Sequence, residues 1–348
     1  AAMLIPFFIR KMKFLKNLTW VYALVGIAAL AVVLILGAYT YGSKISYSIG
    51  GITFQPSEFV KIVFVCMLAA ILCRPVTLWS LMGSALAAGV HVVILALSRD
   101  LGSALIYFVA YVVIVYVATG KKRYLLAGLC GGGGAAYLSY RIFSHVQVRV
   151  QAWKDPFSCI DDAGYQITQS LFAIGSGGWF GLGLFRGTPD SIPFVEADFV
   201  FSAVAEELGI SFSMCMILIC ISCFIMFMNI SMRLQDRFYR LIAFGLGVTY
   251  IFQVFLTVGG GTKFIPMTGV TLPFISYGGS SVLASLIMFS VIQGFYIHND
   301  YLYAAYAHDE DTGADEEYDY DNVYYQYALE HIPKLQMNMT AAFFAVLF

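Results

Sequence analysis

A series of long apolar runs constrains this chain more than any other feature. A helix that crosses the hydrocarbon core of a bilayer needs about 20 predominantly apolar residues. Only 12% of the 348 residues are charged, compared with about 25% in soluble domains, and the mean hydropathy is +0.78. The sequence therefore predicts an all-α, polytopic membrane helix bundle. The predicted spanning runs are 18–41, 57–73, 78–98, 101–119, 124–140, 199–228, 238–258 and 280–297.

Basic residues fall in every second connection between these runs. They gather at 10–16, 74, 121–123 and 233–240. Short loops that carry lysine and arginine stay on the cytoplasmic side of the membrane, so these connections are predicted to be cytoplasmic. The connections predicted to lie outside are 42–56, 99–100, 141–197 and 259–279. Segment 141–197 is then a large extracellular loop before the helix that starts near Phe199.

The two ends of the chain differ from the apolar middle. The apolar stretch 1–9 is too short to span a bilayer, and we interpret it as the end of a helix whose beginning is absent. Residues 1–297 are predicted to form the integral membrane domain. Residues 298–348 are acidic and rich in tyrosine, and we expect a disordered cytoplasmic tail. The net charge of -1 gives no reason to expect a nucleic-acid partner.

Asp198 lies at the entrance of a long apolar helix, and Glu206 and Glu207 follow inside it. Acidic residues at membrane depth are costly and usually functional. At 1.5 Å rise per residue, Glu206 lies about 12 Å deeper than Asp198, so we expect it to pair with a donor inside the bundle. Two interpretations of Asp198 remain open and compatible, a helix cap and a catalytic base.

Other polar groups are placed where they can line a cavity. Glu58 and Lys61 are three residues apart and can pair on one helix face, either to fix helix packing or to form a polar cavity wall. Asp100 can cap the next helix, which leaves Arg99 available to a phosphate. Segment 259–281 is rich in glycine, proline and hydroxyl groups. Non-helical backbone of this kind survives near the membrane only where protein or water satisfies it, so we expect a cavity lining, with an ordinary re-entrant loop as the alternative.

The expected outer face carries several cations, which suit an anionic ligand such as a lipid pyrophosphate. They are Lys44, Arg99, Arg141, Arg149, Lys154, Arg186 and Lys263. The five histidines show no zinc spacing. No cofactor is evident, and a divalent cation is left open. Within the large loop, 164–174 has apolar residues near helical spacing and is predicted to form a short interfacial helix.

Taken together, these segments resemble the SEDS family (shape, elongation, division and sporulation; RodA, FtsW and SpoVE). The matching stretches are 54–58 with Lys61, 100–102, 164–170, 173–178, 198–201, 205–209 and 268–281. The resemblance implies a ten-helix fold, of which the N-terminal helix and part of the second are missing here. It also implies a peptidoglycan glycosyltransferase that uses lipid II at the outer face of the bacterial cytoplasmic membrane. A class B penicillin-binding transpeptidase is the implied partner.

The family's catalytic aspartate falls on Asp198. The chain departs from the family beside this residue, with Glu196-Ala197 in place of His-Thr and Ser98-Arg99 in place of Gln-Pro. We expect Glu196 to raise the pKa of Asp198 through like-charge proximity, and Arg99 to strengthen phosphate binding. The residues expected to contact substrate are Glu58, Lys61, Arg99, Asp100, Arg186, Asp190, Glu196, Lys263, Thr268, Ser276, Gly278 and Gly279.

Two other functions fit the same sequence. A flippase of the lipid-linked precursor would also use intramembrane carboxylates and broken helices, although no inverted repeat is evident. A non-catalytic scaffold of a cell-wall complex would not need the carboxylate of Asp198. The sequence does not separate a role in elongation from one in division or sporulation.

Overall fold

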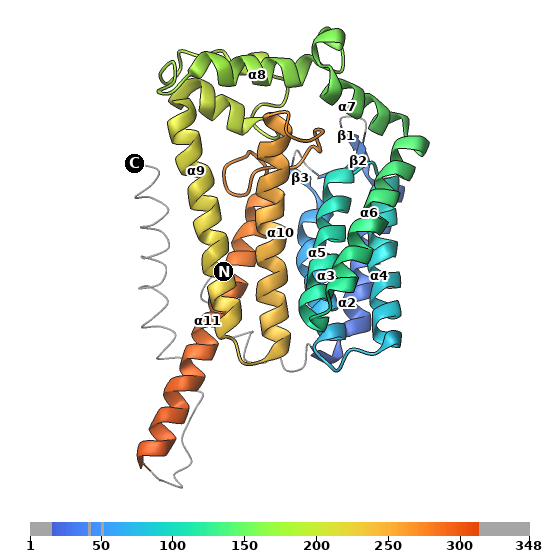
Figure 1. Cartoon of the computed structure of the whole chain (residues 1–348), viewed down its shortest axis with the longest axis vertical. Helices are drawn as coiled ribbons and strands as arrows, with labels where there is room; N and C mark the ends of the chain where they lie inside the picture. The colour runs from blue at the N-terminus through green and yellow to red at the C-terminus, as the bar shows by residue number, and fades with distance from the viewer. Residues whose placement is uncertain (1–15, 41–42, 50–51, 313–348) are drawn as a thin grey trace.

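The computed structural model describes residues 16–40, 43–49 and 52–312, and these residues are mostly helical (Figure 1). Each of the eight predicted spanning runs corresponds to a helix, so this part of the prediction is confirmed. The helices are α2 (Thr19–Leu36), α3 (Pro56–Leu72), α4 (Leu78–Leu97), α5 (Leu101–Thr119), α6 (Lys122–Ile142), α9 (Val200–Arg233), α10 (Arg237–Gly261) and α11 (Gly279–Thr312). The short apolar stretch 1–9 lies outside the described residues.

Six of these helices are long and apolar enough to cross a membrane: α2, α4, α5, α9, α10 and the 279–299 part of α11. Of the other two, α3 is one turn shorter than α4 and is almost entirely buried inside the bundle. Helix α6 carries the Gly131–Gly134 run and has lower hydropathy. The chain is therefore a multi-pass helical membrane protein.

Local chemistry explains where several helices begin and end. Thr77 and Ser80 form a reciprocal capping box at the start of α4. Asp100 caps α5 by accepting a hydrogen bond from the Ser103 N–H at 3.0 Å, as the sequence predicted. Pro56 occupies the first turn of α3, where its missing N–H costs nothing.

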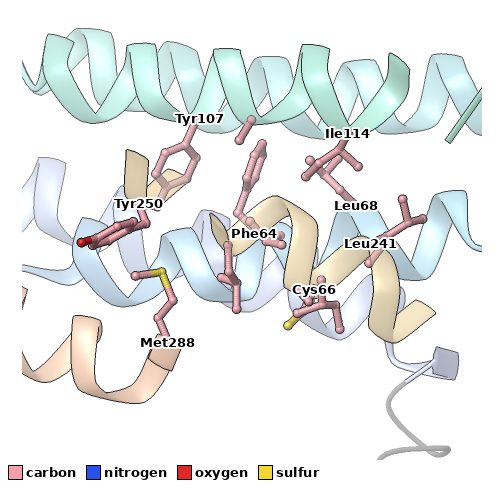
Figure 2. Packing of buried hydrophobic residues seen from close by; sticks show 14 of the residues in the cluster. Phe64, Cys66, Leu68, Tyr107, Ile114, Leu241, Tyr250 and Met288 are labelled. Atoms are coloured by element: carbon pink, nitrogen blue, oxygen red, sulfur yellow. The ribbon is translucent and has the colours of Figure 1, made fainter. Parts of the chain in front are cut away.

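The core lies around α3, which packs against α2, α5 and α10. Figure 2 shows Phe64 and Leu68 of α3 next to Tyr107 and Ile114 of α5, with Leu241 of α10 close by. Burying a large apolar side chain stabilises a fold by about 1.5–3 kcal/mol in water. Inside a bilayer, close packing takes over this role, so the dense centre fixes how the helices sit beside one another.

The loops at one end of the bundle, at the top of Figure 1, contain more structure than the sequence predicted. A small antiparallel sheet forms from β1 (Ala38–Thr40), β2 (Ser43–Ile49) and β3 (Ile52–Phe54), so the fold is not purely α-helical. The large loop 141–197 holds α7 (Ser144–Lys154), which was not predicted. It also holds α8 (Tyr165–Gly177), which confirms the short helix expected at 164–174.

Two long helices depart from the simple prediction. Helix α9 is kinked at Gly209, whose φ and ψ are 86° and 168°. Its freed backbone groups bond to the glycine-rich segment after α8: Leu182 N–H donates to the Glu206 carbonyl at 2.9 Å. Helix α11 continues to Thr312, past the boundary at 297 where the tail was expected to begin. Residues 313–348, where disorder was also expected, lie outside the described residues.

Candidate active site

Asp198 lies just before α9 and does not cap it. The N-cap residue of α9 is Phe199, and no side chain supplies a cap hydrogen bond there. The interpretation of Asp198 as a helix cap is therefore wrong, because Phe199 separates it from Val200, the first residue of the helix. The Asp198 N–H donates to the Phe194 carbonyl at 3.1 Å. This leaves the carboxyl group for other partners.

The segment that follows α10, residues 262–278, holds the backbone around Asp198. Ser276 Oγ donates to the Ala197 carbonyl at 2.5 Å, and Tyr277 N–H donates to the Glu196 carbonyl at 2.7 Å. Ser276 Oγ also accepts a hydrogen bond from Leu272 N–H at 2.8 Å. Ser276 was predicted to contact substrate, but its buried hydroxyl is used within the protein. It positions Asp198.

Asp198 lines a small cavity of about 10 Å³ together with Phe199, Thr268, Gly269 and the end of α10. A space of this size holds about one water molecule. Thr268 Oγ1 is buried and has no hydrogen-bond partner within the described part of the chain. The cavity therefore offers a carboxylate and a hydroxyl to a small polar group. Asp198 and Thr268 are the two predicted site residues that meet here.

The guanidinium of Arg149, on α7, is the positive charge that acts on the Asp198 carboxylate. Its Nη1 donates to the carbonyls of Met267 and Thr268 at 3.4 and 3.3 Å, which fixes α7 to the 262–278 segment. A Cβ atom at Gly269 would lie 3.7 Å from Asp198 Oδ2 and 3.9 Å from Arg149 Nη2. Gly269 thus lies between the two charged groups, in the left-handed region at φ 73°.

The electrostatics of the cavity raise the proton affinity of Asp198. Burial raises the pKa of Asp198 to about 6, while the guanidinium of Arg149 lowers it and the carboxylate of Glu196 raises it. The expected influence of Glu196 is confirmed in direction, with burial as the larger cause. Burial also lowers the pKa of Arg149, and the carboxylates of Asp198 and Asp100 oppose that shift.

A buried polar network lies below the cavity. Lys61 Nζ donates to Glu58 Oε2 at 2.6 Å and to Gln253 Oε1 at 2.5 Å. Gln253 Nε2 in turn donates to the Thr271 carbonyl at 3.0 Å. Ser57 Oγ donates to Asp100 Oδ2 at 3.1 Å. The predicted Glu58–Lys61 pair is thus confirmed, and it ties α3 to α10 and, through Gln253, to the 262–278 segment.

The other predicted site residues lie outside the cavity lining. Arg99 has a positive φ of 63°. It lies near α7, because burial lowers the pKa of His145 on that helix and the charges of Arg149 and Arg99 lower it further. Asp190 and Glu196 are exposed. The Lys263 carbonyl accepts a hydrogen bond from Trp153 Nε1 at 3.1 Å. Gly278 and Gly279 lie at the start of α11.

Arg186 and Glu206 lie together at a second cavity of about 290 Å³. The expectation that Glu206 pairs with a donor inside the bundle is wrong. Its Oε1 accepts a hydrogen bond from the Thr188 N–H of the glycine-rich segment, at 3.1 Å. This segment folds over the first turns of α9, so the carboxylate meets loop backbone.

Sequence reasoning missed two residues of the site. Arg149 was one of several scattered cations, and nothing in the sequence indicated that α7 would fold over the 262–278 segment. Gln253 lies inside the apolar helix α10, and a polar side chain in such a place was a usable signal. Across the described residues, no group of three or more His, Cys, Asp or Glu side chains could hold a metal ion.

The fold and the site define a multi-pass helical membrane protein with a half-buried carboxylate at one end of the bundle. Residues 1–300 match the FtsW/RodA/SpoVE family of cell cycle proteins, and the chain belongs to this family. Peptidoglycan glycosyltransferase RodA of Mycobacterium tuberculosis is 34% identical over 308 residues, which cover 83% of this chain. These residues cover 66% of that relative's length, just under two thirds.

Other relatives and solved structures agree with the family. The probable peptidoglycan glycosyltransferase FtsW of Bacillus subtilis is 31% identical over 279 residues, which cover 76% of this chain and 69% of that protein. A chain from a peptidoglycan synthase complex superposes with a TM-score of 0.71 at 27% identity, covering 86% of both chains. RodA of Thermus thermophilus superposes with a TM-score of 0.60 at 26% identity, covering 85% of this chain and 83% of that one.

Proposed function

We propose that this protein is a peptidoglycan glycosyltransferase that polymerises lipid II into glycan strands. The observation that carries the proposal is Asp198, which lines a cavity with its pKa raised to about 6 and with Arg149 nearby. A general base works best when its pKa lies near the working pH. The names of the RodA and FtsW relatives support the same activity.

In the proposed reaction, the 4-hydroxyl of the acceptor sugar attacks C1 of the donor saccharide. Asp198 takes the hydroxyl proton as the new glycosidic bond forms, and the bond from C1 to the pyrophosphate oxygen breaks. The leaving undecaprenyl pyrophosphate carries away the bonding electron pair, and attack from the opposite face inverts C1. The cavity has the size of a hydroxyl group, so the sugar rings would lie outside it.

Cations near Asp198 would stabilise the leaving group. Arg149 and Arg99 both lie close enough to His145 to lower its pKa, so their charges gather at one place. Fixed positive charge aimed at a developing anion is an efficient form of catalysis. We assign pyrophosphate binding to these two arginines, and propose that Lys263, Arg186 or a divalent cation adds to them.

We further propose that the protein works at the outer face of the bacterial cytoplasmic membrane, with its C-terminal tail in the cytoplasm. A class B penicillin-binding transpeptidase is the proposed partner. The similar chain from a peptidoglycan synthase complex supports this, since that structure concerns coordinated polymerisation and crosslinking. The loops above α9 and α10 would then face the transpeptidase side of the membrane.

The direct test is polymerisation of purified, fluorescent lipid II by the full chain in detergent or liposomes. The assay is run with and without the transpeptidase and with and without divalent cation. Glycan strands resolved on a gel are the expected product. Transfer of labelled lipid II across the liposome bilayer without chain growth would overturn the proposal in favour of a flippase.

The pH profile of polymerisation tests the role of Asp198. A general base must be ionised, so the rate should fall as the pH drops through about 6. Arg149→Gln removes a cation that lowers the pKa of Asp198, so the acid limb should move to higher pH. Glu196→Gln removes a carboxylate that raises it, so the limb should move to lower pH. Shifts of both variants in one direction would contradict this assignment.

Gly269→Ala tests the geometry between Asp198 and Arg149. An alanine at φ 73° is strained by about 1–2 kcal/mol, and its methyl group would fill the space between the two charges. We expect lower thermal stability and slower polymerisation. Gly133→Ala on α6 is the matched control, because a Cβ there meets open space. Equal activity of both variants would show that this spacing is unimportant.

A further inference from the structure

The second cavity contains a buried carboxylate oxygen without a partner. Glu206 is 5% exposed, and its Oε1 is occupied by the Thr188 N–H. Its Oε2 is buried and accepts no hydrogen bond from any described residue. A buried oxygen of this kind costs roughly 1–3 kcal/mol unless a donor reaches it. Glu206 lines the cavity, so a donor brought by a ligand there would satisfy this oxygen once the carboxylate turns toward it.

The cavity around Glu206 is built by two elements of the large loop and by α9. Gln169 and Phe172 come from α8, and Arg186, Thr188 and Ser191 from the segment that follows it. Gly187 is part of this construction, because a Cβ there would lie 2.9 Å from the Glu206 carboxyl carbon. The absence of a side chain at Gly187 lets the loop backbone come this close to the Glu206 carboxylate.

The lining combines polar groups with one aromatic face. Amide, hydroxyl and guanidinium groups surround the carboxylate, and Phe172 is 50% exposed at the cavity. A volume of about 290 Å³ is close to the lower end of small-ligand sites, which begin near 300 Å³. A ligand that fits must donate to Glu206, accept from Arg186 and present an apolar face to Phe172. Sugar rings with hydroxyl and acetamido groups have these properties.

We propose that the second cavity is a saccharide subsite that holds an N-acetylated sugar of the glycan strand. The inference rests on the proposed function and extends it to a second binding site. Glu206 lies six residues into α9, about 9 Å along the helix axis from its first residue, and Asp198 precedes the helix, so the sugar held there is not the ring that reacts. Ala173 lines this cavity and Phe199 lines that of Asp198, and both belong to one apolar cluster that forms a shared wall.

Glu206→Gln is the informative variant. The amide oxygen of glutamine can still accept from Thr188 N–H, so the loop keeps its anchor. The amide nitrogen, in contrast, replaces the acceptor Oε2 with a donor. Glu207→Gln is the matched control. It removes the same charge from the neighbouring residue, whose Oε1 accepts from Phe185 N–H at 3.1 Å outside the cavity.

The probe is chitotetraose, a soluble oligomer of N-acetylglucosamine, titrated into the purified full chain in detergent micelles. Saturation-transfer NMR is expected to show saturable binding to the wild type, to Glu207→Gln and to Asp198→Asn. A lost hydrogen bond to a charged acceptor should raise the Kd of Glu206→Gln about tenfold or more. Phe172→Ser, at an exposed position, should also weaken sugar binding. This variant replaces Glu206→Gln in the test if Glu206→Gln fails to fold.

Three results would overturn the subsite. The first is an equal Kd for Glu206→Gln and the wild type, and the second is the absence of saturable binding to the wild type. The third is that phosphatidylethanolamine micelles displace the bound sugar while further free sugar does not. The last result would identify a lipid headgroup as the occupant. The test is separate from that of the proposed reaction. Polymerisation that survives Asp198→Asn would remove the catalytic role of Asp198, while sugar binding that depends on Glu206 would still stand.

Discussion

Asp198→Asn is expected to slow lipid II polymerisation by about 10²–10⁴-fold, the usual contribution of a general base. Asparagine has the same shape as aspartate but cannot take up the proton of the acceptor hydroxyl. The fold should persist, because Ser276 and Tyr277 hold the backbone at Ala197 and Glu196 and not the carboxylate. The initial rate of strand formation from fluorescent lipid II, measured with saturating substrate, gives the effect on kcat.

The matched control is Asp161→Asn, which removes one negative charge from an exposed part of the same large loop. It should polymerise at the wild-type rate. Thermal unfolding of all three proteins separates a catalytic defect from a folding defect. An Asp198→Asn variant that is stable and fully active would exclude this residue as the base and with it the proposed mechanism.

Lys61→Met is expected to destabilise the protein by about 3–5 kcal/mol, the usual cost of leaving a buried charge without its partner. Lys61 and Glu58 are 3% and 7% exposed, and the ammonium also donates to Gln253. Removing it leaves two acceptors, Glu58 Oε2 and Gln253 Oε1, without this donor. The change in the free energy of unfolding is measured by denaturation in mixed detergent micelles.

The double variant Glu58→Gln/Lys61→Met tests the cause of that loss. It contains no unpaired charge, and the amides of residues 58 and 253 can bond to each other, so most of the lost stability should return. Lys122→Met, at an exposed site on α6, should have little effect. If Lys61→Met and the double variant are equally unstable, lost packing and not the unpaired buried charge causes the loss of stability.

The helices could be predicted because each depends on local sequence. A long apolar run must satisfy its own backbone hydrogen bonds within a membrane, and α4, α5 and α10 lie close to their predicted ranges. The small sheet and α7 could not be predicted in the same way. Strands β1 and β3 have only three residues each and form because they pair with β2. Helix α7 has mixed composition, and its contacts with the 262–278 segment stabilise it.

The candidate site divides in a similar way. Asp198 stood out because acidic groups beside apolar helices are rare, and Thr268 belongs to segment 259–281, which was expected to line a cavity. Arg149, the charged partner of Asp198, could not be identified from the sequence. It is one of seven cations expected on the outer face, and it lies 49 positions before Asp198 in the chain. Glu206 was recognised as unusual, but its true neighbour, the backbone at Thr188, became visible only with the loop folded over α9.

The sequence by itself determined that this chain is a membrane helix bundle of the FtsW/RodA/SpoVE family and that Asp198 is its most informative carboxylate. Hydropathy, helix length and motif order are properties of the chain read one segment at a time. Only the tertiary structure decided which groups meet at the site. Charge interactions and hydrogen bonds act across a few ångströms of space, and residues 149, 198 and 269 come within that range only after α7, α9 and α10 have packed.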